Sequence, residues 1–98
     1  MIVTVFRNRL NPEAAEEYYP VAQRMSEEAT TIPGYISHKT FTADDGERVI
    51  IVEHENMDAV KAWSQHEDHR AAKKRGREFF YDSYSIQVCE VVRENRKP

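Results

Sequence analysis

The chain has 98 residues, of which 40% are hydrophobic and 32% are charged, and its formal net charge is -3. This length suits a single domain with a thin core, and the composition is that of an ordinary globular protein. The acidic balance argues against a nucleic-acid partner, no apolar run approaches the roughly 20 residues of a membrane helix, and the N-terminus lacks the pattern of a secretory signal.

The N-terminal segment predicts a β-strand. Ile2–Leu10 is rich in β-branched and apolar residues, the composition that strands favour. Side chains alternate between the two faces of a strand, so Thr4, Phe6 and Asn8 are predicted to share one face.

A helix is predicted to follow this strand. Asn11–Glu13 supplies a side chain that can cap a helix, a proline for the first turn and an acid near the positive end of the dipole. An apolar stripe at helical spacing then includes Tyr18, Val21, Ala22, Met25 and Ala29. Because Pro20 cannot donate to the helical ladder, we expect a kink or a break near Glu17–Tyr19.

Two strands and a hairpin occupy the middle of the chain. Ile32–Gly34 ends the helix, Tyr35–Thr42 is a predicted strand, and Ala43–Glu47 contains the Asp-Gly signal of a hairpin turn. Arg48–Glu55 is the next strand, and its apolar run Val49–Val52 indicates a central position. One face of the earlier strand is predicted to carry Tyr35, Ser37, Lys39 and Phe41.

The second half of the chain repeats the order of helix and strand. Asn56 is a predicted cap for a helix at Met57–Gln65. A second helical piece is expected from Glu67 to about Arg75, with Gly76 as its end. Tyr81–Val92 is the last predicted strand.

The resulting order, βαββαβ, is that of the ferredoxin-like α+β fold, a four-stranded antiparallel sheet with helices on one face. We assign residues 1–93 to one domain and 94–98 to a polar tail. No segment remains to cover the other face of the sheet, so we expect a homodimer that packs sheet against sheet. The single cysteine, Cys89, excludes an internal disulfide. It is predicted to be a buried thiol, and the chain is predicted to be cytoplasmic.

The segment Trp63–Ala72 reads W-x-x-H-x-x-H-R-A-A, and Gly76-Arg77 and the strand YSIQVCEV follow it. In a βαββαβ chain of about this length, these features resemble the antibiotic biosynthesis monooxygenase family of dimeric α+β barrels. The resemblance implies a homodimer joined through its sheets and last strands, with a pocket between sheet and helices in each subunit. It also implies relatives of three kinds: cofactor-independent oxygenases of phenols, hydroquinones or polyketide-derived aromatics, haem-degrading enzymes, and proteins without an assigned activity.

The haem-degrading branch can be compared residue by residue. It uses an asparagine late in the first strand, a tryptophan on the second helix and an iron-ligating histidine about three turns later. Asn8 and Trp63 match the first two, but Lys73 stands at the place of the histidine and cannot ligate iron while protonated. His66 and His69 come one or two turns too early, so haem degradation is the weakest alternative.

The candidate catalytic residues are Asn8, Trp63, His66 and His69. An unperturbed histidine titrates near pH 6.5, so His66 or His69 suits the removal of a proton from a phenol. The amide of Asn8 suits a substrate oxygen or dioxygen, although a hydrogen bond to a nearby loop is an equal alternative. Trp63 is also explained as a core residue. The two histidines lack acids that would complete a metal site, so neither metal nor cofactor is expected.

Five further residues are predicted to bind substrate: Phe6, Tyr18, Met25, His54 and Phe80. For the aromatic residues the alternative is a place in the core or the dimer interface, and for His54 it is a solvated strand end. Two functions therefore remain open. One is a cofactor-independent monooxygenase of a small aromatic, hydroquinone or polyketide-like substrate, and the other is a non-catalytic dimeric ligand-binding or stress-associated protein.

Overall fold

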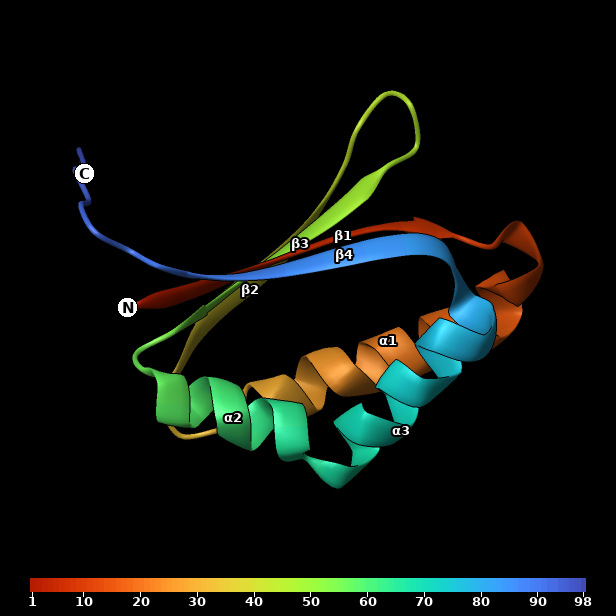
Figure 1. Cartoon of the computed structure of the whole chain (residues 1–98), viewed down its shortest axis with the longest axis horizontal. Helices are drawn as coiled ribbons and strands as arrows, with labels where there is room; N and C mark the ends of the chain where they lie inside the picture. Colours follow the sequence, from red (N-terminus) through yellow and green to blue (C-terminus); the bar gives the residue numbers. More distant parts are fainter.

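A four-stranded antiparallel sheet, packed on one face by helices, makes up the computed structural model of the chain (Figure 1). The strands are β1 (Ile2–Leu10), β2 (Tyr35–Thr42), β3 (Arg48–His54) and β4 (Tyr81–Glu90), in the order β2-β3-β1-β4. The helical elements are η1 (Pro12–Ala14), α1 (Ala15–Ala29), α2 (Met57–Gln65), α3 (Glu67–Arg75) and η2 (Gly76–Phe80). The predicted ferredoxin-like α+β fold is confirmed.

The register of the central strands decides which residues meet at each end of the sheet. Asn8 on β1 lies opposite Arg48 on β3 and Tyr84 on β4, whereas Ile2 lies opposite His54. β3 lies between β2 and β1, which confirms its predicted central position. We call the side that carries Phe6 and faces the helices the cavity face, and the opposite side the outer face.

β2 departs from the predicted alternation at its start. The pairing of β2 with β3 shifts between Tyr35 and Ser37, and such a bulge reverses the alternation of side chains beyond it. Tyr35 was predicted to share a face with Ser37. Instead its ring lies 6.2 Å from that of His54, and its hydroxyl lies 2.5 Å from Nδ1 of His38.

Helix α1 continues through Pro20, so the break predicted as one of two outcomes near Glu17–Tyr19 is absent. Proline removes one hydrogen bond, here to the carbonyl of Glu16. Pro20 and Glu16 are both exposed, so water can satisfy that carbonyl. The helix therefore loses a single bond on its wet side and keeps its apolar side against the sheet.

Helix α3 ends at Arg75 with Gly76 as its C-cap, as predicted, but the glycine does not turn the chain out of the helical conformation. Its backbone is helical, with φ -57° and ψ -49°, and the chain continues through the π-helical turn η2 to Phe80. The glycine is explained by close packing, because a Cβ at this position would lie 2.8 Å from Cε2 of Tyr81. It allows the ring of Tyr81 to lie directly against the turn.

The buried core is small and lies where η1, α1 and η2 meet. Ala14, Tyr18 and Phe80 form it, and the rings of Tyr18 and Phe80 are 5.4 Å apart in an edge-to-face arrangement. Such aromatic pairs add to the stabilisation that comes from buried area. This core closes one end of the space between sheet and helices and leaves the middle of it open.

The outer face is uncovered in the single chain. Cys89, opposite Val3 on β4, is exposed, so the prediction of a buried thiol is wrong for the isolated subunit. Phe41 on β2 is 51% exposed. None of the helices combines the length and the apolar character needed to cross a membrane.

Candidate active site

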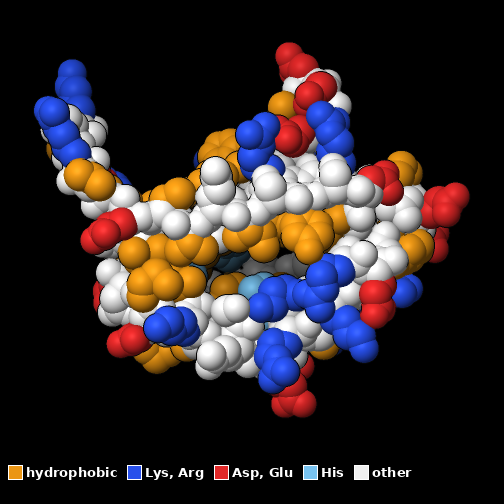
Figure 2. All heavy atoms as spheres, in the orientation of Figure 1, with side chains coloured by type: hydrophobic (Ala, Val, Ile, Leu, Met, Phe, Trp, Pro, Cys, Tyr) orange, Lys and Arg blue, Asp and Glu red, His pale blue; other side chains and the backbone are white.

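A cavity of about 570 Å³ lies between the sheet and the helices. Figure 2 shows the hollow between β4 and the helices, with a histidine side chain in it and lysine and arginine side chains on one side of the opening. Hydrophobic residues make up 16 of the 27 that line it. Volumes of about 300–1,000 Å³ with mostly apolar walls are typical of small-molecule sites, so the cavity suits a small aromatic ligand.

Most of the predicted site residues line this cavity: Phe6, Tyr18, Met25, His54, Trp63, His69 and Phe80. The other two, Asn8 and His66, are not among its lining residues. Trp63 is half-buried and forms part of the wall, so it does not fill the space.

His69 stacks on Trp63. The ring centroids are 4.0 Å apart and the planes differ by 11°, while Nδ1 of His69 lies 2.9 Å from the carbonyl oxygen of Trp63. A carbonyl only accepts, so Nδ1 carries the proton and Nε2 keeps a free lone pair. The break between α2 and α3 at His66 creates this geometry, because it turns the start of α3 back over the end of α2.

Burial lowers the pKa of His69 to about 4, against a smaller opposing effect of its bond to the carbonyl of Trp63. The positive charges of Lys73 and His66 act in the same direction as burial. His69 is therefore neutral at pH 7 and presents a hydrogen-bond acceptor at the cavity wall.

His66 lies in a different cluster. Its Nδ1 is 3.8 Å from Oε2 of Glu28, and the ligand atoms of His66, Glu28 and Asp68 lie within 4.8 Å of one another. Desolvation, followed by the neighbouring Asp68, raises the pKa of Glu28. Asp68 lies two residues after His66, whereas Glu28 comes from the distant end of α1, so local spacing did not predict the full cluster.

Asn8 is buried beside the cavity, with 2% of its surface exposed, and neither atom of its amide has a hydrogen-bond partner. The predicted alternative, a bond to a neighbouring loop, is absent. Arg48, directly opposite on β3, also has a buried Nη1 without a partner, and its guanidinium lies 4.9 Å from the ring centre of Tyr18. The sequence analysis missed Arg48, which stands at a strand end where a solvated charge is ordinary.

His54 is 1% exposed and lines the cavity, and both of its ring nitrogens lack partners. The prediction of a solvated strand end is therefore wrong. It also lies at the opposite end of β3 from Arg48 and Asn8. Desolvation lowers its pKa. His38, which the sequence analysis missed, lines the cavity and lies 2.5 Å from the hydroxyl of Ser26.

Lys73 also lines the cavity, at the place of the histidine in the haem-degrading relatives. Its Nζ donates to the carbonyl oxygen of Ser64 at 2.8 Å and to the hydroxyl of Ser64 at 3.0 Å. The lysine thus caps the last turn of α2. These contacts give Lys73 a structural role and do not fit iron ligation at this position.

The sequence profile described as antibiotic biosynthesis monooxygenase matches residues 1–75. The chain belongs to this family. A curated relative, the uncharacterized protein YqjZ of Bacillus subtilis (strain 168), is 34% identical over 77 residues, which are 79% of this chain and 68% of that protein.

Solved structures of other proteins share the fold. One described as an antibiotic biosynthesis monooxygenase is 16% identical, with a TM-score of 0.81 over 95% of this chain and 100% of the other. Rv0793 from Mycobacterium tuberculosis is 14% identical, with a TM-score of 0.83 over 97% of this chain and 98% of the other. At this level of identity the likeness establishes the fold, and function depends on the site.

Proposed function

We propose that the chain is a cofactor-independent monooxygenase that oxidises a small phenol, hydroquinone or polyketide-like aromatic. The observation that carries this proposal is the stacked pair of Trp63 and His69 on the wall of an apolar cavity. The pair offers an aromatic surface beside a neutral imidazole whose free nitrogen is Nε2. Membership of a monooxygenase family supports it.

The reaction balances without a cofactor. Removal of a phenolic proton gives an anion that transfers an electron to dioxygen far more readily than the neutral phenol. When an aromatic C–H becomes C=O and the phenol becomes a quinone, the substrate supplies four electrons. One oxygen atom enters the product, and the other leaves as water with the two hydrogens that the substrate loses.

Each cavity residue has a role in this scheme. His69 accepts the phenolic proton through Nε2, as expected of a general base within hydrogen-bond reach. Trp63 stacks on the aromatic substrate. Asn8, whose amide lies beside the cavity and not on its wall, is assigned to a substrate oxygen that reaches the Arg48 end. Binding surface comes from Phe6, Tyr18, Met25, His54 and Phe80. His66, directed to Glu28, is outside the catalytic group.

The outer face supports a homodimer formed by a second copy of the chain, through the sheet faces and the last strand. Apolar side chains are exposed there, including Phe41, and Val92 just beyond β4 is 94% exposed. Covering such surface is favourable at about 25 cal/mol per Å². Sizing in solution at micromolar concentration should give twice the mass of the chain, and a monomer would contradict the arrangement.

A non-catalytic ligand-binding protein of the same fold is the alternative. The cavity of about 570 Å³ suits the binding of a small ligand whether or not a reaction follows. Haem degradation has less support, because Lys73 is engaged with Ser64. Binding without oxygen consumption would favour the non-catalytic function.

Oxygen uptake with a panel of hydroquinones and polycyclic phenols tests the enzyme proposal. We expect the wild type to consume oxygen and, under ¹⁸O₂, to place one labelled atom in the product. Trp63→Phe should lower the rate, and His69→Gln should lower it by about 10²–10⁴-fold, the range of general base catalysis. His66→Gln is the matched control, because it removes a histidine that does not line the cavity. No uptake by the wild type across the panel would sink the enzyme proposal.

A further inference from the structure

The cavity is lined by positive charge and by no negative charge. The lysines and arginines among its lining residues are Lys39, Arg48, Lys73 and Arg77, and none of the lining residues is Asp or Glu. The ammonium of Lys39 lies 5.5 Å from the ring centre of Phe41 on the outer face, so its charge is directed away from the cavity. The chain as a whole has more acidic than basic residues, 17 against 14. The sign of charge at the cavity therefore differs from that of the whole molecule, which favours the entry of an anion.

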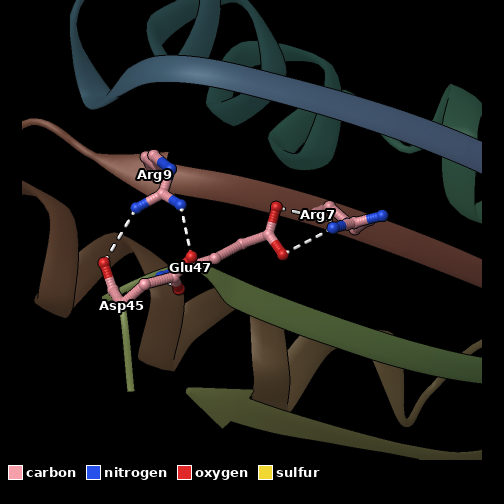
Figure 3. A network of polar contacts seen from close by, with 4 residues as sticks. All are labelled: Arg7, Arg9, Asp45 and Glu47. Carbon is pink, nitrogen blue, oxygen red and sulfur yellow. Dashed lines mark hydrogen bonds and ion pairs between the residues drawn. The ribbon is translucent and has the colours of Figure 1, made fainter. Parts of the chain in front are cut away.

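Arg48 differs from the arginines on the other side of the same sheet. Arg7 and Arg9 of β1 each hold a carboxylate: Arg7 bonds both oxygens of Glu47, and Arg9 bonds Asp45 (Figure 3). Arg48 forms no ion pair, although its Nη1 is buried. Burying a charged group is costly unless it is paired and hydrogen-bonded. Arg48 thus has the unsatisfied geometry of a group that binds a ligand.

A second unsatisfied group lies beside it. The buried amide of Asn8, opposite Arg48 in register, has a free NH₂ donor and a free carbonyl. Buried polar side chains without partners are rare in folded proteins, and each one calls for an explanation. Arg48 lines the cavity and Asn8 does not, so a ligand oxygen at this end would accept from Arg48, with the unpartnered amide of Asn8 opposite it in the sheet.

The end of the cavity near His54 differs from the Arg48 end in charge. His54 lies six positions along β3 from Arg48, and its pKa is lowered, so it is neutral near pH 7. Val52, two positions from His54 on the same face of β3, also lines the cavity. One end thus presents the cation of Arg48, whereas the other presents the imidazole of His54 and apolar groups such as Val52.

We infer that the cavity takes an aromatic ligand that carries an anionic oxygen group, a carboxylate or a phenolate, with that group on Arg48 and its ring in the apolar part. This inference deepens the proposed function and rests on it for the claim that the ligand is a substrate. In the oxygenase, Arg48 would stabilise the phenolate that His69 helps to form, and this compensates for the weak basicity of the buried imidazole.

Two fluorescent probes with one skeleton test the charge preference. 8-Anilinonaphthalene-1-sulfonate is anionic, and N-phenyl-1-naphthylamine is its neutral counterpart. Energy transfer from Trp63, the only tryptophan, reports binding near the cavity. In wild type we expect the sulfonate to bind at least about tenfold more tightly, which corresponds to about 1.4 kcal/mol, the scale of a charge-assisted hydrogen bond. The preference should weaken with added salt.

Variants locate the preference. Arg48→Gln should abolish it and leave the neutral probe unchanged, while Arg48→Lys should keep part of it because the charge remains without the planar fork. Arg7→Gln makes the same charge change on the outer face and should keep the preference in full.

Equal binding of the two probes by wild type, binding of neither probe, or a preference that survives Arg48→Gln would overturn the inference. The comparison of probes in wild type needs no variant, so it holds even if Arg48→Gln fails to fold. A preference that depends on Arg48 in a protein that consumes no oxygen would refute the oxygenase and leave the anionic ligand standing. Oxygen consumption without the preference for the anionic probe would support the oxygenase and refute the anionic ligand.

Discussion

The two faces of one sheet treat polar side chains in opposite ways. On the outer face, Arg7 and Glu47 form a two-bonded ion pair, with Nη2 to Oε1 at 2.7 Å, and the pKa of Arg7 is raised by this partner. On the cavity face, Arg48 and Asn8 are adjacent and unsatisfied, and His54 at the other end is unsatisfied as well. The exposed groups have partners, although water alone would have satisfied them, and the buried groups have none.

This difference separates stability from function. An unsatisfied buried group costs stability, and natural sequences accept such costs mainly at functional sites. The outer pairs contribute little, because exposed ion pairs gain modestly in water. The cavity face is therefore where substitutions should reveal a compromise between folding and ligand binding, and the outer face is where they should not.

The largest expected effect on the cavity face is a loss of folding stability at low pH, caused by the buried His69. The unfolded histidine takes up a proton below about pH 6.5, whereas the folded pKa is about 4. Between these values the unfolded state binds more protons, so stability should fall as the pH drops from about 6.5 to about 4. Each pKa unit corresponds to about 1.4 kcal/mol, so we expect a loss of about 1–3 kcal/mol that His69→Gln removes.

Urea denaturation at a series of pH values between 7.5 and 4 measures this loss. At pH 7.5 His69 is neutral in both the folded and the unfolded state, so it contributes no pH dependence there. For each protein, the free energy of unfolding at lower pH is therefore compared with its own value at pH 7.5. Parallel curves for wild type and His69→Gln would show that burial of this imidazole does not control the acid response.

At Asn8, by contrast, we expect a substitution to increase the stability of the protein. Asn8→Leu removes a buried amide without partners and keeps a similar volume, so it should stabilise the ligand-free protein by about 1 kcal/mol while weakening the anionic probe. The matched control is Asn11→Leu, since the side chain of Asn11 caps η1 by accepting from the backbone of Glu13. Its loss should destabilise by about 1 kcal/mol. Thermal unfolding of the two variants decides, and destabilisation by both would remove the distinction between satisfied and unsatisfied asparagines.

The smallest effect belongs to the outer face. Arg7→Gln breaks the ion pair with Glu47, and we expect a slight fall in unfolding midpoint at low salt that disappears in 1 M salt, because exposed charges are then screened. Probe binding should not change. A large loss of stability that persists in high salt would show that the outer pairs are structural, and would break the comparison.

Local patterns predicted most of the framework. The residue ranges of α2 and α3 agree with the structure, because Asn56 caps α2 and apolar spacing is a short-range property. The shared face of Phe6 and Asn8 also follows from alternation alone. The error at Tyr35 and the unpredicted helical turn that continues from Gly76 have a common cause. A bulge and a close contact with the ring of Tyr81 depend on segments that local patterns do not include.

The candidate site was predicted in part. The sequence marked Trp63 and His69 through their spacing, and the structure places both on the cavity wall. It did not separate His69 from His66, because the two differ only in what α1 and the break between helices bring near them. It also missed Arg48, since an arginine at a strand end is ordinarily solvated.

The sequence by itself determined the order of elements, the fold and the apolar character of one sheet face, because these depend on periodicity and capping within a few residues. Only the tertiary structure decided that Trp63 lines a cavity, that Lys73 is held by Ser64, and that Arg48 and Asn8 have no partners. Whether a polar group is satisfied depends on every segment that packs around it. That property, which carries the inference of an anionic ligand, is set by contacts between residues far apart in the chain.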